Sequence, residues 1–208
     1  MPLIILILLI GLVLYFVWPK LDAITYVTDS TGYISLILIL ISLVLGSINL
    51  ISRRKNPISS YYRRDISILG GLLAIIHSLC GLFVHLRGNN WQYFLSKTGN
   101  VYSIRLDEFG LANYFGLFSL LLIFLLLLIS NDYSVRKLNP KNWKNLQRFS
   151  YLMFVLVLIH SIYYMIVMNN AKMIYYIYIP LFLIVLFFQM IGFRIRLVNR
   201  KNKQIIEN

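Results

Sequence analysis

The chain has 208 residues, of which 59% are hydrophobic and only 13% are charged. Because soluble domains carry about a quarter charged residues, this composition excludes an ordinary soluble fold, and a single cysteine excludes both a disulfide framework and a zinc-finger type of site. The formal charge of +13 would indicate nucleic acid in a soluble protein. Here the basic residues separate long apolar runs, which is typical of an integral membrane protein in contact with lipid.

Six stretches without Lys, Arg, Asp or Glu approach the roughly 20 residues that a helix needs to cross a bilayer. In chain order they are Leu3–Trp18, Tyr33–Ile51, Ile66–Leu86, Phe109–Ile129, Phe149–Met168 and Met173–Phe193. The first is short, but it lacks the basic start and small-residue cleavage site of a signal peptide, so we expect an uncleaved helix. The sequence therefore predicts an all-α membrane protein, a six-transmembrane-helix bundle forming a single transmembrane domain over residues 1–208.

The distribution of Lys and Arg predicts how the bundle is oriented. With both termini inside, fifteen basic residues fall on the inner side and five on the outer side, which is a strong positive-inside bias. The outer five are Lys20, Arg87, Lys97, Arg105 and Lys172. The three tryptophans fall at span ends, where indole prefers the headgroup region. We expect cytoplasmic termini and a multi-pass protein of the bacterial cell membrane.

Two histidines are predicted at one depth in the membrane. His77 lies 13 residues past Arg64 and His160 lies 12 residues past Arg148, each on a span that enters from the inside. At about 1.5 Å per residue these separations are roughly 20 Å and 18 Å. The two imidazoles should therefore lie about two thirds of the way across a core of about 30 Å.

Ionisable groups at this depth are costly and usually functional. Two neutral imidazoles that face each other suit the axial positions of a heme iron. The alternative is that His77 and His160 each make an interhelical hydrogen bond and nothing more. Gly70, Ala74 and Gly81 share the helical face of His77 and would leave room for a flat macrocycle, although small residues at this spacing also serve close helix packing.

His85 is predicted at the outer interface, about 32 Å past Arg64 along the helix. We expect a solvated histidine there, with contact to a heme propionate or to a substrate as the alternative. Cys80 is expected to be a small buried apolar residue. The adjacent carboxylates of Asp107 and Glu108 are expected to be solvated rather than to hold a cation.

Two segments carry a resemblance to a known family. Arg63–His77 reads RRDISILGGLLAIIH, and Val135–His160 reads VRKLNPKNWKNLQRFSYLMFVLVLIH. Both are similar to the basic-start, apolar, histidine-ending motifs of ferric reductase-like transmembrane domains. The chain most resembles the small heme-binding membrane subunits of the MsrQ/YedZ type, and more distantly NADPH oxidases and STEAP metalloreductases. The resemblance covers roughly Arg53 to Met168.

The resemblance implies one b-type heme held by His77 and His160. The family usually has a histidine where this chain has Gln147, and two-heme members need a second histidine where this chain has Arg63. An inner heme is therefore not expected. By analogy with single-heme relatives that carry a flavin, FMN or FAD could contact four residues at the inner end. The alternative is that these residues only anchor the helix ends at the inner membrane surface. They are Arg63, Arg64, Gln147 and Arg148.

The leading hypothesis is a heme b-binding electron-transfer subunit. It would take electrons from a cytosolic flavin reductase or quinol and pass them to an outer-side reductase, ferric iron or another oxidant. The redox chemistry would belong to the cofactor. No catalytic triad, carboxylate dyad or nucleotide motif is visible, so the chain is not expected to be a complete enzyme. The alternatives are a small transporter or channel component with a histidine-based polar site, and a non-redox membrane scaffold.

Overall fold

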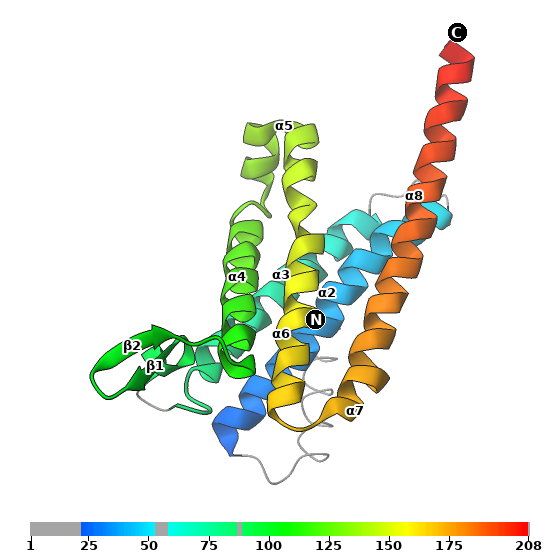
Figure 1. Cartoon of the computed structure of the whole chain (residues 1–208). Coiled ribbons are helices and arrows are strands. Elements are labelled where there is room, and N and C mark those ends of the chain that lie inside the picture. The colour runs from blue at the N-terminus through cyan, green and yellow to red at the C-terminus, as the bar shows by residue number, and fades with distance from the viewer. Residues whose placement is uncertain (1–21, 53–57, 87–88, 208) are drawn as a thin grey trace.

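The computed structural model describes residues 22–52, 58–86 and 89–207 (Figure 1). The predicted first span, Leu3–Trp18, lies outside the described residues. Within them, five helical stretches are long and apolar enough to cross a membrane: Ala23–Ile51, Tyr62–Gly81, Glu108–Leu128, Asp132–Val167 and Ala171–Asn199. The prediction of a helical membrane protein is confirmed to that extent, but the described part also contains a two-stranded β-hairpin, so it is mostly rather than wholly helical. A count of six spans stays a prediction.

Helices α4 (Glu108–Leu128) and α6 (Phe149–Val167) match the predicted spans to within a residue. Helix α2 (Ala23–Ile51) begins ten residues before the predicted Tyr33. Its first turns are rich in hydroxyl side chains, and these donate back to carbonyls of their own helix, for example from Thr28 to Ile24 at 2.8 Å. Because the polar groups are satisfied within the helix, they do not end it.

Helix α3 (Ile58–Gly81) ends five residues before the predicted Leu86. The side chain that holds this end is Tyr93, which is 2% exposed. Its hydroxyl donates to the carbonyl of Gly81 at 3.0 Å and accepts from the N–H of His85 at 3.2 Å. Beyond Gly81 the N–H groups of Phe83 and Val84 bond carbonyls three residues earlier, and that of His85 bonds Tyr93, so these groups are satisfied without further α-helical turns.

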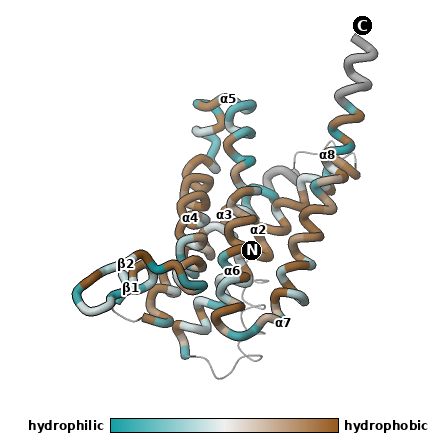
Figure 2. The backbone as a smooth tube through the Cα atoms, viewed as in Figure 1, coloured by the Kyte–Doolittle hydropathy of each residue, from teal (hydrophilic) through white to brown (hydrophobic). Residues whose placement is uncertain are grey.

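The helices pair as α2 with α3 and α4 with α6, and α2 also packs against α8 (Ile179–Glu207) and touches α6 (Figure 1). The buried core lies along these contacts and includes Leu43, Ile123 and Phe154. Interhelical hydrogen bonds supplement it, since Gln189 of α8 donates to the carbonyl of Leu43 and accepts from the Tyr151 hydroxyl. Apolar residues dominate the long helices (Figure 2), and many of their large apolar side chains are exposed on the surface of the bundle, as expected in lipid.

The segment between α4 and α6 is helical rather than an open loop. Helix α5 (Asp132–Gln147) contains a sharp kink at Asn139, whose φ is 57° and ψ is 156°. Pro140 follows and disfavours the α-helical conformation at the residue before it, and asparagine adopts a positive φ more readily than most residues. This helical hairpin, the start of α3 and the C-terminal part of α8 lie at one end of the bundle, opposite β1 and β2 (Figure 1). The cytoplasmic position of that end stays a prediction.

The last span begins with a short α7 (Ala171–Met173) and a π-helical turn, η2 (Ile174–Tyr178), before α8. Pro180, the second residue of α8, has no N–H and its ring would clash with the carbonyl four residues earlier. The widened π turn lies directly before this proline. The irregularity expected from Pro180 is therefore confined to the start of the helix.

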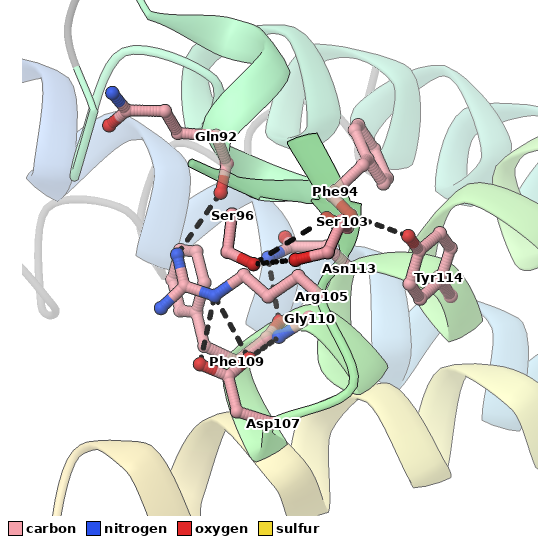
Figure 3. Close-up of polar contacts among 10 residues, drawn as sticks. All are labelled: Gln92, Phe94, Ser96, Ser103, Arg105, Asp107, Phe109, Gly110, Asn113 and Tyr114. Carbon is pink, nitrogen blue, oxygen red and sulfur yellow. Dashed lines mark hydrogen bonds and ion pairs between the residues drawn. The ribbon is translucent and has the colours of Figure 1, made fainter. Parts of the chain in front are cut away.

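The segment between α3 and α4 has its own secondary structure in the described part. A 3₁₀ turn, η1 (Asn90–Tyr93), precedes an antiparallel hairpin of β1 (Leu95–Thr98) and β2 (Val101–Ile104). Gly99 at the tip has a φ of +62°, which glycine adopts without strain. Arg105 then binds the carboxylate of Asp107 at 2.9 Å and the carbonyl of Gln92 at 3.1 Å (Figure 3), which ties the hairpin to the start of α4.

Asp107 is the N-cap of α4, because its carboxylate accepts from the N–H of Gly110 at 2.8 Å. We expect Asp107→Ala to destabilise the first turn of α4 by about 1 kcal/mol, and therefore to raise amide exchange there about fivefold. Asp107→Asn keeps the cap acceptor and should lose less. Hydrogen exchange at pH 6 measures both variants, and unchanged protection in Asp107→Ala would contradict this role.

The same contacts set the pH range over which this cap acts. Partial burial raises the pKa of Asp107, but the N–H of Gly110 and the Arg105 guanidinium outweigh it and hold the pKa below its usual 3.8. The stabilisation is present above 3.8 and is lost as the pH falls through the lowered pKa. We therefore expect protection of this turn to be constant from pH 5 to pH 7.

Candidate heme-ligand site

The side chains of His77 and His160 meet inside the bundle. Their ring centroids are 6.2 Å apart and the ring planes are nearly perpendicular, at 84°. His77 comes from α3 and His160 from α6, two helices that do not pack closely on each other. The matching depth expected from the sequence therefore brings the two rings together across the space between the two helix pairs.

Each imidazole is held by a backbone carbonyl of its neighbouring helix. Nδ1 of His77 lies 2.8 Å from the carbonyl oxygen of Thr28, and Nδ1 of His160 lies 2.8 Å from that of Ala112. A carbonyl oxygen only accepts, so Nδ1 must carry the proton and donate it. In a neutral ring this leaves the Nε2 lone pair available as a metal ligand, with the ring orientation fixed through Nδ1.

The donor set fits a heme better than a bare metal ion. Among the described residues, no group of three or more His, Cys, Asp or Glu side chains gathers to hold a metal, so a bare ion at this pair would have two protein ligands. A porphyrin supplies four nitrogens of its own and needs only the two axial ones. With metal–nitrogen bonds of about 2 Å and roughly 1 Å from nitrogen to ring centre, axial imidazoles lie about 6 Å apart, in agreement with 6.2 Å.

Aromatic side chains connect this pair to the hairpin end of the bundle. The ring of Tyr164 lies 5.0 Å from that of His160, and His85 stacks on Tyr164 at 5.9 Å. The Tyr164 hydroxyl donates to Asn113 at 3.0 Å, which fixes the ring between the two histidines. His85 is partly exposed, and its ring also lies against Phe109 in an edge-to-face contact. His85, which was expected at the outer interface, is therefore separated from His160 by a single aromatic ring, that of Tyr164.

The small residues of α3 face α2. A Cβ added to Gly70 would lie 3.2 Å from Leu38, and Ala74 belongs to the buried core. Gly81 faces Thr28, with 3.7 Å available to an added Cβ. These contacts are those of close helix packing, which was the alternative interpretation. Contact of Gly70, Ala74 or Gly81 with a macrocycle stays a prediction.

The four residues considered for flavin binding lie at the α5 end. Arg64 pairs with Asp132, Gln147 donates to the Ser130 hydroxyl at 3.2 Å, and the Arg63 guanidinium lies against Gly46. Arg148 begins α6. Of the four, only Gln147 lines a cavity, which measures about 50 Å³ and is otherwise lined by apolar side chains and several serine hydroxyls. It contains no histidine, and flavin contact stays a prediction.

Comparison with known proteins places the chain in a family. The model for the ferric reductase like transmembrane component matches residues 31–158. This is more than half of the chain, and the chain belongs to that family. The match includes His77 and ends two residues before His160. No curated protein and no solved structure shows significant similarity to the chain.

Sequence reasoning did not identify the partners of the two histidines. Thr28 and Ala112 act through backbone carbonyls, and residue type carries no signal for such a role. Tyr164 could have been identified from the sequence, because it follows His160 by four residues and must lie on the same helical face. An aromatic residue one turn from a candidate ligand, toward the outer face, is a signal that could have been used.

Proposed function

We propose that the chain is the membrane subunit of an electron-transfer system and holds one heme b between His77 and His160. The observation that carries this proposal is the pair of rings at 6.2 Å, each oriented by an Nδ1 hydrogen bond. When bound, the heme would supply one-electron chemistry at its iron. The chain supplies the two Nε2 ligands and a surrounding of apolar helices. Membership of the ferric reductase-like family supports the electron-transfer role.

We further propose that electrons leave at the hairpin end. The ring of Tyr164 lies beside that of His160, and the ring of His85 lies beside that of Tyr164, so the two side chains lead in space from His160 toward that end. The exposed part of His85 is accessible to an acceptor. The positive-inside rule makes this the outer side, so the acceptor is an outer reductase partner or ferric iron. The donor, a cytosolic flavin reductase or a quinol, would approach the α5 end. There the arginines and Gln147 are suited to a flavin phosphate or ring. Likeness to the MsrQ/YedZ type is part of this proposal.

Transmembrane electron transfer can be tested in lipid vesicles that contain the protein and trap ferricyanide inside. Adding dithionite outside should bleach the trapped ferricyanide when the heme carries electrons across. Vesicles with His160→Ala protein are the matched control, because they keep the protein and its leakiness but lack one ligand. Equal bleaching rates in the two preparations would overturn the proposal.

We expect Gln147→Ala to leave the heme content unchanged. Gln147 lies at the far end of α5 and bonds Ser130, and an amide is not an axial ligand of the usual kind. The measurement is the pyridine hemochrome assay on purified wild-type and variant protein. Loss of heme in Gln147→Ala would refute the one-heme assignment, because it would place a second heme at the α5 end.

A further inference from the structure

The same local arrangement occurs twice, once for each histidine. In α2, the carbonyl that accepts from His77 belongs to Thr28, and the residue four positions later is Gly32. In α4, the carbonyl that accepts from His160 belongs to Ala112, and the residue four positions later is Gly116. The two carbonyl–histidine pairs are separated by 49 and 48 residues along the chain.

Both glycines lie directly against the imidazoles. A Cβ added to Gly32 would lie 2.7 Å from Nδ1 and 2.9 Å from Cε1 of His77. A Cβ added to Gly116 would lie 2.7 Å from Nδ1 and 2.9 Å from Cε1 of His160. Cβ atoms do not approach ring atoms this closely, so either substitution must displace the imidazole or separate the helices.

Helix geometry explains why a glycine recurs at this spacing. Each Cα–Cβ bond in an α-helix tilts toward the N-terminus, so the side chain four residues later covers the carbonyl of the earlier residue. That carbonyl already accepts the N–H four residues later within the helix. A glycine at that position leaves room for a ring as wide as an imidazole to lie against the helix and reach the second lone pair of the carbonyl. Gly32 and Gly116 therefore uncover the carbonyls of Thr28 and Ala112.

We propose that Gly32 and Gly116 are positioning residues for heme ligation. By uncovering one carbonyl each, they hold both histidines in the Nδ1-protonated tautomer, with each Nε2 available as an axial ligand. This inference rests on the proposed function, since it concerns the ligands of the same heme. It assigns the tautomer and the ring orientation of each ligand to a glycine on the neighbouring helix.

Two other glycines provide matched controls. Gly192 in α8 is packed as tightly, since an added Cβ would lie 2.8 Å from the Ser47 hydroxyl, but it does not touch a histidine. Gly71 in α3 is also close-packed, since an added Cβ would lie 3.0 Å from the Leu127 side chain, and its nearest neighbours include no histidine. Gly192→Ala and Gly71→Ala therefore report the effect of a helix-packing clash that does not involve an imidazole.

The experiment is heme titration and spectroscopy of the full-length protein with Gly32→Ala, Gly116→Ala, Gly192→Ala or Gly71→Ala. Loss of an outer hydrogen-bond partner of a metal-bound histidine typically weakens binding about 10–100-fold. We expect that loss of heme affinity in Gly32→Ala and Gly116→Ala, together with conversion of the low-spin bis-histidine electron paramagnetic resonance signal to a high-spin one. Both controls should keep the low-spin signal.

The outcomes separate this inference from the proposed function. If wild-type protein binds no heme, the proposed function fails. If wild-type protein binds heme and Gly32→Ala and Gly116→Ala match Gly192→Ala in affinity and spin state, the positioning role is overturned. If one glycine variant does not fold, the other decides, because Gly32 and Gly116 lie on different helices.

Discussion

His77→Ala and His160→Ala are each expected to reduce heme retention to background. Each histidine contributes one of two axial nitrogens, and no other described His, Cys, Asp or Glu side chains gather there to replace it. Breaking one bond also leaves the partner imidazole without its shared metal, so the two losses should not be additive. The measurement is heme per chain after purification from heme-replete cells, with the absorption spectrum of what remains.

His85→Ala is the matched control for these variants. The ring of His85 stacks on Tyr164, which in turn contacts His160, so His85 is near the ligand pair without touching it. We expect full heme content in His85→Ala and, in the vesicle assay, slower transfer to the trapped acceptor when the hairpin end faces inward. Full heme retention in His160→Ala, or complete loss in His85→Ala, would contradict the assignment of ligands.

Tyr93→Ala is expected to cost about 3–5 kcal/mol in the free energy of unfolding, the usual loss for a buried aromatic side chain. Tyr93 is 2% exposed, packs against Phe109 with 5.5 Å between ring centroids and bonds the carbonyl of Gly81. Its removal leaves a cavity and frees the end of α3. Thermal unfolding in detergent, with heme-free protein, measures the loss without a contribution from the cofactor.

Two variants show which part of Tyr93 matters. Tyr93→Phe keeps the ring and loses the hydroxyl, so it should cost only about 1 kcal/mol. Tyr102→Ala, in the hairpin, removes a tyrosine that is 55% exposed and should change stability by less than about 0.5 kcal/mol. A loss in Tyr93→Ala no larger than that in Tyr102→Ala would show that η1 and the hairpin do not stabilise the bundle.

The helices and the common level of the two histidines could be predicted because they depend on quantities that are local in sequence. Apolar length fixes a span, and the rise of 1.5 Å per residue fixes depth. Helices α4 and α6 therefore matched to within a residue. The ends of α2 and α3 did not, because they depend on where hydroxyl side chains and Tyr93 find partners in the folded chain.

Contacts between helices were the least predictable part of the site. Which carbonyl meets a histidine depends on the register of two packed helices, and a single apolar face fits several registers. Thr28 and Ala112 were missed for this reason. The hairpin of β1 and β2 was also missed, because its strands are only four residues each and lie in the segment between two predicted spans. Gly99 and Asn100 at its tip are turn residues and could have indicated it.

The most direct measurement of the central claim is the heme content and reduced-minus-oxidised spectrum of the purified wild-type chain. The pair of imidazoles on α3 and α6 predicts close to one heme b per chain, with the sharp Soret and α bands of low-spin bis-histidine ligation. A colourless preparation from heme-replete cells, or two hemes per chain, would contradict it.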